Sequence, residues 1–263
     1  DSRSDVPRMT RAARAFLESL DSDQREAATF ALDAEERSRF HFIPIEMFER
    51  GGVMLKEMTP EQRTRAEDLL RAGLSQKGYM TAEQIMELED VLLAMEGGQR
   101  FARDRDEYLV SIFGTPTEGA SWGWRFEGHH LSLHFTIVEG SVAVASPAFL
   151  GTNPAEVREG PQRGRRPLAD REDVARRLVR SFDDAQRASA IIDVDAPRDI
   201  FTGNAPDVDP LEPSGLSIGE MNGRQRTVVM ELIDVYLSIM SAEIADHRLQ
   251  RLLDSDVERL TFA

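Results

Sequence analysis

Three of the five histidines in the chain lie close together, in the stretch GWRFEGHHLSLHF at residues 123–135. Imidazole is a common ligand of zinc, copper, iron and nickel, and it also exchanges protons near neutral pH. His129, His130 and His134 are therefore candidate ligands of a divalent transition metal ion, or candidate proton carriers. Either chemistry would act on a small molecule or an anionic ligand.

The spacing of these histidines on an extended strand would divide them between two faces. Successive side chains of a strand point to opposite faces, so His129 and His130 would diverge. His130 and His134 would share a face but lie about 13 Å apart, because each residue advances a strand by about 3.3 Å. Ligands of one zinc ion each lie about 2 Å from it, so such a strand cannot by itself bring all three to one metal.

Arg125 and Glu127 precede the histidines and widen the chemistry that the stretch could support. Glu127 could act as a base or a metal ligand, on the same strand face as His129. The planar guanidinium of Arg125 could orient a carboxylate or phosphate. Arg125, Glu127, His129 and His130 are thus the candidate catalytic residues, and His129, His130 and His134 the candidate metal ligands. Packing and hydrogen bonding alone are the alternative for each.

Composition argues against several other kinds of site. The chain has 263 residues and a formal net charge of −15, which does not suit binding to nucleic acid or an anionic membrane surface. The absence of cysteine removes thiolate catalysis, iron–sulfur clusters and disulfides. Apolar runs fall far short of the roughly 20 residues that span a bilayer. The first residues, DSRSDVPRM, include no initiator Met, which a removed leader or a trimmed start would each explain. We expect an exported protein, periplasmic or secreted, with the cytoplasm as the alternative.

Helical and strand patterns alternate along the chain in blocks. Helical periodicity and capping residues, among them Thr59 and Thr81, predict helical segments at 8–32, 58–75, 81–98, 170–192 and 220–255. Within the first of these, a new helix should start with Asp21 or Ser22 as its cap. Alternating apolar residues from Leu131 to Ile137, a turn at Glu139-Gly140 and a return over 141–145 predict a β-hairpin. We therefore expect an α+β fold, with helical layers packed on an antiparallel sheet.

An internal repeat connects the two helical blocks. FLESLDSDQREAATFALDA (16–34) matches LVRSFDDAQRASAIIDVDA (178–196), and MTPEQRTRAEDLLRAGLS (58–75) matches MNGRQRTVVMELIDVYLS (221–238). The two offsets are nearly equal, which favours a tandem duplication with a pseudo-twofold axis over the chance use of a common helix start.

The duplication predicts one globular domain in three parts. These are residues 1–110 and 166–263, the helical parts of the first and second repeats, and residues 111–165, a β-hairpin and loop unit. It also places a second strand unit after Ala263, so we expect the native chain to continue there.

Several segments resemble the DUF3500 family, bacterial proteins of unknown function. They are WGWRFEGHHLSLHF, SPAFLGTNPAEV and SFDDAQRASAI, and the resemblance runs from ERSRFHFIP to the C-terminal helix. It implies a C-terminal extension carrying an Asn-His-x-His segment, which could meet His129 or His130. It also implies that His134, whose family position is often Asn, is the weaker site member. The resemblance implies export for many members and no particular reaction.

The residues and the resemblance together lead to one expected function and two alternatives. We expect a metal-dependent enzyme of the hydrolase or oxidoreductase class, with its site at the histidine edge of the sheet. The alternatives are a non-catalytic module that binds a small ligand or a metal, and histidines with a purely structural role.

Overall fold

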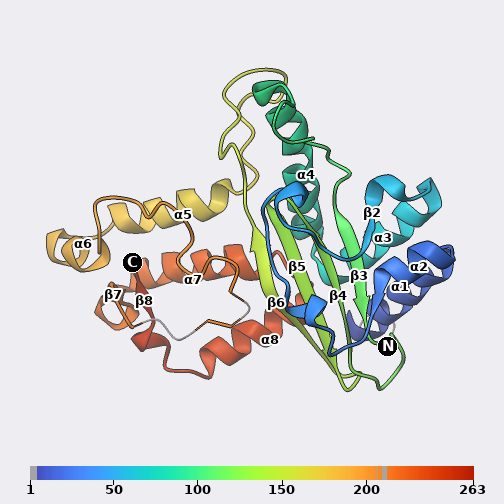
Figure 1. Cartoon of the computed structure of the whole chain (residues 1–263). Coiled ribbons are helices and arrows are strands. Elements are labelled where there is room, and N and C mark those ends of the chain that lie inside the picture. Colours follow the sequence, from blue (N-terminus) through green and yellow to red (C-terminus); the bar gives the residue numbers. More distant parts are fainter. Residues whose placement is uncertain (1–4, 206, 209–211) are drawn as a thin grey trace. The chain divides into compact units, whose positions relative to one another are not determined.

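The computed structural model describes residues 5–205, 207–208 and 212–263 (Figure 1). Its helices are α1 (Asp5–Ser19), α2 (Ser22–Ala28), α3 (Pro60–Gly73), α4 (Gln76–Glu96), α5 (Ala169–Arg180), α6 (Asp184–Ala190), α7 (Gly223–Leu237) and α8 (Ala242–Leu253). Its strands are β1 (Thr29–Phe30), β2 (Val53–Met54), β3 (Leu109–Phe113), β4 (Trp122–Gly128), β5 (Leu131–Val138), β6 (Val142–Leu150), β7 (Leu216–Ser217) and β8 (Thr261–Phe262). Short 3-10 helices are η1 (Glu35–Ser38), η2 (Ile45–Met47), η3 (Leu55–Glu57), η4 (Ile218–Glu220) and η5 (Val257–Arg259).

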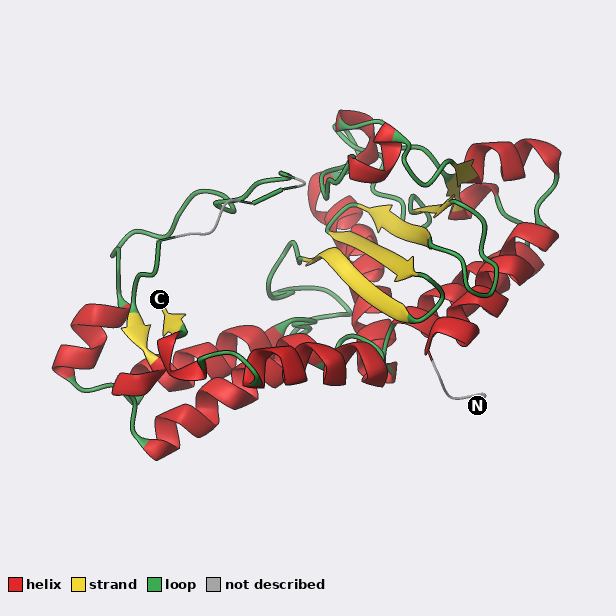
Figure 2. Ribbon diagram, turned by 90° about the horizontal axis from the view of Figure 1, so that it is seen from below, coloured by secondary structure: helices red, strands yellow, loops and turns green. Residues whose placement is uncertain are grey.

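The chain divides into two compact units. Unit 1 comprises residues 1–167 and 239–244, and unit 2 comprises residues 168–238 and 245–263. Unit 1 contains a six-stranded sheet in the order β1-β3-β4-β5-β6, with β2 also paired to β3 (Figure 2). All neighbouring strands in it are antiparallel except β1 and β3. The predicted α+β class with a mostly antiparallel sheet is therefore confirmed.

One face of this sheet is apolar and packs against helices. Alternate residues of β4 and β5 supply its large side chains, all of them at most 2% exposed: Trp122, Trp124, Phe126, Leu131, Leu133, Phe135 and Ile137. Helix α3 approaches this face so closely that a Cβ at Gly73 would lie 2.7 Å from the rings of both Trp124 and Phe135. A larger residue at this position would therefore push the helix off the sheet.

The opposite face of the same strands is polar but equally buried. It carries Ser111, Arg125, Glu127, Ser132 and His134, none of them more than 6% exposed. The chain between α2 and β2 covers it, and we call residues 35–51 the strap. Polar side chains buried this way need partners inside the protein, and the strap supplies many of them.

Several helix boundaries differ from those expected from the sequence. The helix expected at 81–98 begins five residues earlier, because Ser75 caps it by accepting a hydrogen bond from the Gly78 amide. Thr81 instead lies inside the helix and bonds back to the Lys77 carbonyl. The expected restart within 8–32 is confirmed at Asp21, and within 170–192 Asp183 starts a second helix in the same way, each with a capping box.

Unit 2 is a small helical body with a short two-stranded ladder. Helices α5 and α7 pack on each other, and β7 pairs antiparallel with β8. Its core consists of seven buried apolar residues, Leu178, Phe182, Ala190, Leu216, Ile218, Met221 and Val229.

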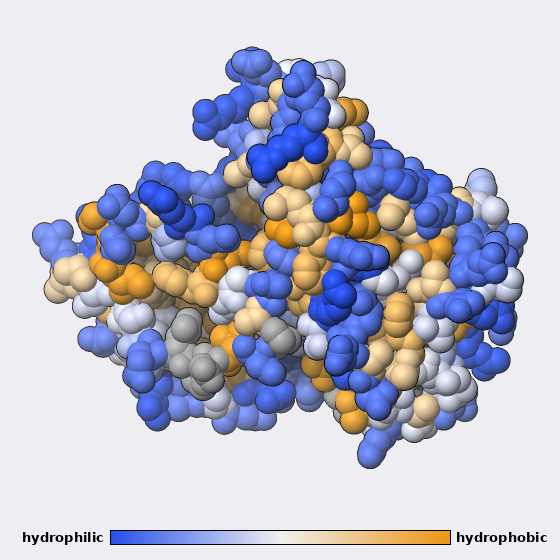
Figure 3. Space-filling view, in the orientation of Figure 1, coloured by the Kyte–Doolittle hydropathy of each residue, from blue (hydrophilic) through white to orange (hydrophobic). Residues whose placement is uncertain are grey.

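The surface of the protein is largely hydrophilic. Hydrophilic residues cover much of the face seen in Figure 3, as expected for a chain of net charge −15. Among the described helices, none is both long and apolar enough to cross a bilayer.

Candidate functional site

The structure separates the five candidate residues into two groups, both in unit 1. Arg125, Glu127 and His134 project from neighbouring strands onto the polar sheet face and lie beneath the strap. His129 and His130 are the two residues of the turn between β4 and β5. The sequence pattern treated this turn as part of a strand, so it did not foresee that the two histidines leave the sheet.

Arg125 holds the strap by its backbone. Its Nη1 donates to the carbonyls of Glu36 at 3.0 Å and Arg39 at 2.9 Å. Its Nη2 donates to the carbonyl of Gly51 at 2.9 Å and to the Glu36 carboxylate at 2.6 Å. A guanidinium with this many internal acceptors, and 0% exposed, is a structural anchor and not a receptor for a soluble anion.

Glu127 is the acidic centre of the same buried group. Its carboxylate accepts from the Ser132 hydroxyl and from His134 Nε2 at 3.0 Å, and it lies 2.7 Å from Arg50 Nε. Burial alone would raise the pKa of Glu127, but the bond from His134 and the positive charge of Arg125 hold that pKa below its usual value. Burial lowers the pKa of His134 despite its contact with Glu127. The pair is therefore a carboxylate and a neutral imidazole at pH 7.

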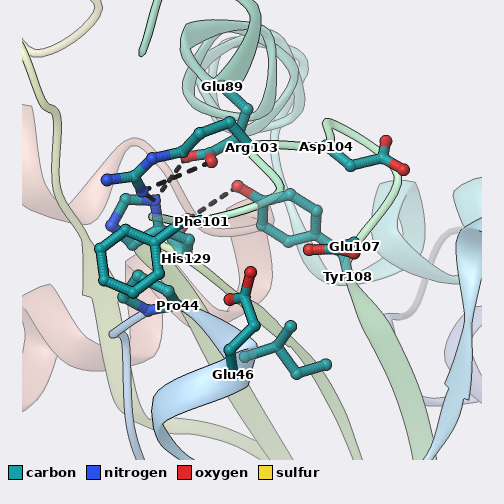
Figure 4. Close-up of a pocket in the computed structure, with 10 residues that line it drawn as sticks. Pro44, Glu46, Glu89, Phe101, Arg103, Asp104, Glu107, Tyr108 and His129 are labelled. Carbon is teal, nitrogen blue, oxygen red and sulfur yellow. Dashed lines mark hydrogen bonds and ion pairs between the residues drawn. The ribbon is translucent and has the colours of Figure 1, made fainter. Parts of the chain in front are cut away.

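His129 lies in a different place, a narrow hollow that opens to solvent (Figure 4). Residues from the strap, from the 101–108 segment and from α4 line it together with His129. His129 Nδ1 lies 2.5 Å from Glu89 Oε1, and the Tyr108 hydroxyl donates to the His129 carbonyl at 2.7 Å. Burial raises the pKa of Tyr108, so its hydroxyl keeps the proton that it donates.

Two groups compete for His129 Nδ1, and their chemistry decides the tautomer. Glu89 can only accept a hydrogen bond there, whereas Arg103 Nη1, at 3.1 Å, can only donate one. The carboxylate is nearer, and Arg103 also makes two bonds to Glu96 at 2.9 and 3.0 Å. Nδ1 therefore carries the proton and Nε2 is the basic nitrogen. Nε2 makes no hydrogen bond to any residue that the structure describes, and it is not fully buried.

Backbone strain is concentrated beside His129. Three described residues other than glycine have positive φ, and two of them are Arg103 at 53° and His130 at 60°. Each such residue costs roughly 1–2 kcal/mol. Arg103 reaches His129 through its guanidinium, and the His130 ring lies 4.0 Å from the His129 ring. The surrounding structure thus holds His129 between two strained neighbours, as is typical of functional sites.

His130 is held neutral by its surroundings. Burial, with smaller contributions from the positive charges of His129 and Arg103, lowers the pKa of His130 to about 3. Its Nδ1 is buried and finds no partner among the described residues. Its backbone is well bonded, because its amide donates to the Phe42 carbonyl at 2.8 Å and its carbonyl accepts from the Gly151 amide at 2.8 Å.

The low pKa of His130 predicts acid sensitivity. An unfolded chain takes up a proton at this histidine below pH 6.5, whereas the folded chain takes it up only near pH 3. The free energy of unfolding therefore decreases as the pH is lowered from 6.5 toward 3. Asparagine cannot take up this proton and tolerates a positive φ. We expect the free energy of unfolding of His130→Asn, relative to that of the parent, to increase by about 3 kcal/mol as the pH is lowered from 8 to 4.5. Urea unfolding at both pH values measures it.

A matched control is His247→Asn, which changes an exposed histidine on α8. It should leave the pH dependence unchanged. A pH-independent difference between His130→Asn and the parent would show that His130 is not held neutral.

Three residues of the hollow were missed by the sequence reasoning. Glu89, Arg103 and Tyr108 are each less than 10% exposed and contact His129. A signal for Glu89 was present, since it falls on the apolar stripe of α4 between Ile85 and Leu92. A carboxylate on such a stripe must find a buried partner. Arg103 lies in an irregular segment and offered no comparable signal.

The arrangement does not favour a metal site built from the three histidines. His134 bonds to Glu127 beneath the strap, whereas His129 bonds to Glu89 in the hollow. No group of three or more His, Asp or Glu side chains within the described residues is arranged to hold a metal ion. The metal site therefore stays a prediction.

Comparison with known proteins gives one match. A family model described as "Protein of unknown function (DUF3500)" matches residues 2–263. No curated protein and no solved structure matches the chain.

Proposed function

The chain belongs to the DUF3500 family, and from that starting point we propose that it is a hydrolase of small molecules in which His129 is the general base. The observation that carries this proposal is the contact of 2.5 Å between His129 Nδ1 and Glu89 in a solvent-open hollow. A carboxylate that holds one ring nitrogen leaves the other free to take a proton. Glu89 is itself fixed, because it is 4% exposed and lies 3.7 Å from Arg103.

The proposed reaction is the attack of water on a carbonyl carbon. His129 Nε2 takes a proton from water as the water oxygen bonds to the carbon, and the same proton then passes to the leaving group as its bond breaks. Glu89 stabilises the positive charge that the ring carries in between. Proton transfer of this kind needs no redox partner, so it supports the hydrolase class over the oxidoreductase class.

The other candidate catalytic residues have different roles in this proposal. Arg125 and Glu127 act at a distance by holding the strap that lines the hollow. His130 is a neutral neighbour of His129 and contributes its shape and strain.

Hydrolysis of short activated esters tests the proposal. Glu89→Gln should lower the rate by about ten-fold or more, since glutamine can accept the Nδ1 bond but cannot balance the ring's charge. A rate that is independent of Glu89 would overturn the proposal.

Metal-dependent hydrolysis is the second candidate, and one observation favours it. The buried Nδ1 of His130 has no partner within the described part of the chain, and the His130 ring adjoins that of His129. Two imidazoles are nevertheless one fewer than the three protein ligands of catalytic zinc sites. Titration with Zn²⁺ separates the candidates: saturable stoichiometric binding that His130→Ala removes would favour the metal, and its absence the metal-free base.

We also infer that unit 2 is a duplicate of the helical part of unit 1, as the sequence repeat predicted. Matching glutamine pairs support this. In unit 1, Gln62 donates to the Ser19 carbonyl at 3.0 Å and to Gln24 at 2.7 Å. In unit 2, Gln225 donates to the Ser181 carbonyl at 2.9 Å and to Gln186 at 2.8 Å.

The short strand ladders of the two units match as well. Val53 pairs with Val110 in unit 1, and Leu216 pairs with Phe262 in unit 2. In each case the next backbone bond continues the ladder: Leu55 donates to Tyr108, and Ile218 donates to Leu260, both at 2.8 Å. Convergence on the same side-chain and backbone bonds is harder to explain by chance than a common helix-start motif.

The duplication predicts equal effects of equivalent substitutions. Gln62→Ala and Gln225→Ala each remove a buried amide that bonds the two ends of a helix pair. Each should lower the free energy of unfolding of its own unit by about 1–3 kcal/mol, because carbonyl and amide groups are left unpaired. Hydrogen exchange of α3 and of α7 reports the two units separately. A large effect in one unit and none in the other would contradict equivalent roles.

A further inference from the structure

The strap is a loop that closes on itself. Its ends meet where the Gly51 amide donates to the Glu36 carboxylate at 2.7 Å, and its middle is joined where Arg39 donates to the Glu49 carbonyl at 2.7 Å. Its only regular structure is two 3-10 turns, η1 and η2. Compact loops with adjoining ends move as units and frequently carry function.

The strap is attached to the sheet through buried charges and through aromatic contacts of Phe40 with His134 and of Phe42 with Phe149. Arg125 grips its backbone, as described above, and Arg50 of the strap meets Glu127 of β4 with both side chains 0% exposed. The Phe42 carbonyl accepts a hydrogen bond from the His130 amide. Among the described residues, this is the one backbone hydrogen bond between the strap and the β4–β5 turn. Arg50 Nε and Glu127 Oε1 lie 2.7 Å apart. The attachment therefore combines a buried ion pair with backbone hydrogen bonds and aromatic contacts.

The same loop forms one wall of the His129 hollow. Pro44, Ile45 and Glu46 line it, and Figure 4 shows Pro44 and Glu46 on the side opposite Glu89. Glu46 also accepts a hydrogen bond from the Ala102 amide at 2.9 Å, which joins the strap to the opposite rim. Any movement of the strap must therefore open or close the hollow.

A pair of glycines lies at the end of the strap. Gly52 has a φ of +136°, which residues with a side chain rarely adopt, and a Cβ there would lie 2.9 Å from the Val110 carbonyl. Gly51 carries the backbone bonds that hold the strap shut. Glycine gives the backbone the freedom that a hinge requires.

We propose that the strap is the lid of the hollow, and that it opens as one piece about Gly51 and Gly52. The buried group of Arg50, Arg125 and Glu127 is its latch. The closed lid restricts the access to His129, whose side chain is 11% exposed, and the open lid admits the substrate. This inference uses the proposed function only to identify the hollow as the site, and its test needs no enzymatic activity.

Hydrogen exchange followed by mass spectrometry tests the lid directly. In the parent protein, peptides within 36–51 should exchange together and at least about ten-fold faster than β4 and β5. Arg50→Gln, which weakens the latch from the strap side, should accelerate the strap by a further ten-fold or so and leave β4 and β5 unchanged. The matched control is Arg14→Gln on α1, where the arginine is exposed and lies as far as 4.0 Å from its partner Glu18.

Acylation of histidines by diethyl pyrocarbonate gives a second readout. In Arg50→Gln, His129 should be acylated several-fold faster than in the parent. His247, which is exposed, should react equally fast in both proteins. A chain without cysteine also allows a unique bridge: Glu46→Cys with Ala102→Cys, joined by a short bis-maleimide, should hold the lid shut. The bridged protein should lose acylation at His129 and keep it at His247.

Two results would overturn the lid. One is a strap that exchanges only at the rate of β4 and β5, since it would then open only when the whole sheet unfolds. The other is an unchanged rate of His129 acylation in the bridged protein, which applies even if Arg50→Gln fails to fold. If the parent protein does not hydrolyse esters but its strap exchanges as expected, the result would contradict the proposed base and not the lid.

Discussion

Replacing Glu127 by leucine should lower the free energy of unfolding by about 3–5 kcal/mol, the largest effect on stability that we expect from a single substitution. Glu127 is 0% exposed and compensates the charge of Arg50, which is equally buried. Without the carboxylate, Arg50 stays in the interior as an uncompensated cation, and His134 and Ser132 lose their common acceptor. Urea unfolding, followed by the fluorescence of Trp122 and Trp124, measures the loss.

The matched control removes the arginine as well. Replacing Arg50 by methionine together with Glu127→Leu should recover at least about 1 kcal/mol, because an apolar pair avoids the buried charge. If the double variant is less stable than Glu127→Leu alone, the uncompensated charge is not the cause of the loss.

Replacing His129 by glutamine should lower the rate of ester hydrolysis by about 10²–10⁴-fold, the usual contribution of a general base. Glutamine fills a similar volume and can still bond to Glu89, but it cannot take a proton from water. The loss should appear in kcat and not in KM, since the substrate is bound by the rest of the hollow.

Two controls limit the interpretation of this result. His247→Gln changes an exposed histidine and should leave the rate unchanged. Adding Glu89→Gln to His129→Gln should cost little more, because a carboxylate that acts through His129 has no effect without it. Equal and additive losses would show that the two residues act separately.

The fold class was predictable because its signals are local. Alternating apolar residues in β4 and β5, and caps such as Thr59, determine strands and helices through neighbouring residues. The boundary that failed has a local rival, because Ser75 caps α4 ahead of Thr81. Periodicity alone cannot rank two competing caps.

The candidate site was only partly predictable, because its geometry depends on distant segments. The stretch that holds His129 could be singled out from the sequence, but Glu89 lies 40 residues away and Arg103 lies 26 residues away. Arg125 was expected to face a substrate, and the structure turns it toward the carbonyls of the strap instead. Only the tertiary fold decides whether an arginine meets a ligand or a loop.

The position of the proton on the His129 ring decides whether this residue can act as the base. Nitrogen-15 NMR of the imidazole at neutral pH distinguishes a protonated from an unprotonated ring nitrogen. We predict a proton on Nδ1, held by Glu89, and a bare Nε2 facing the hollow, and we predict that Glu89→Gln weakens this preference. A proton on Nε2, with Nδ1 bare and accepting from Arg103, would contradict it, because the nitrogen that must accept the proton would already carry one.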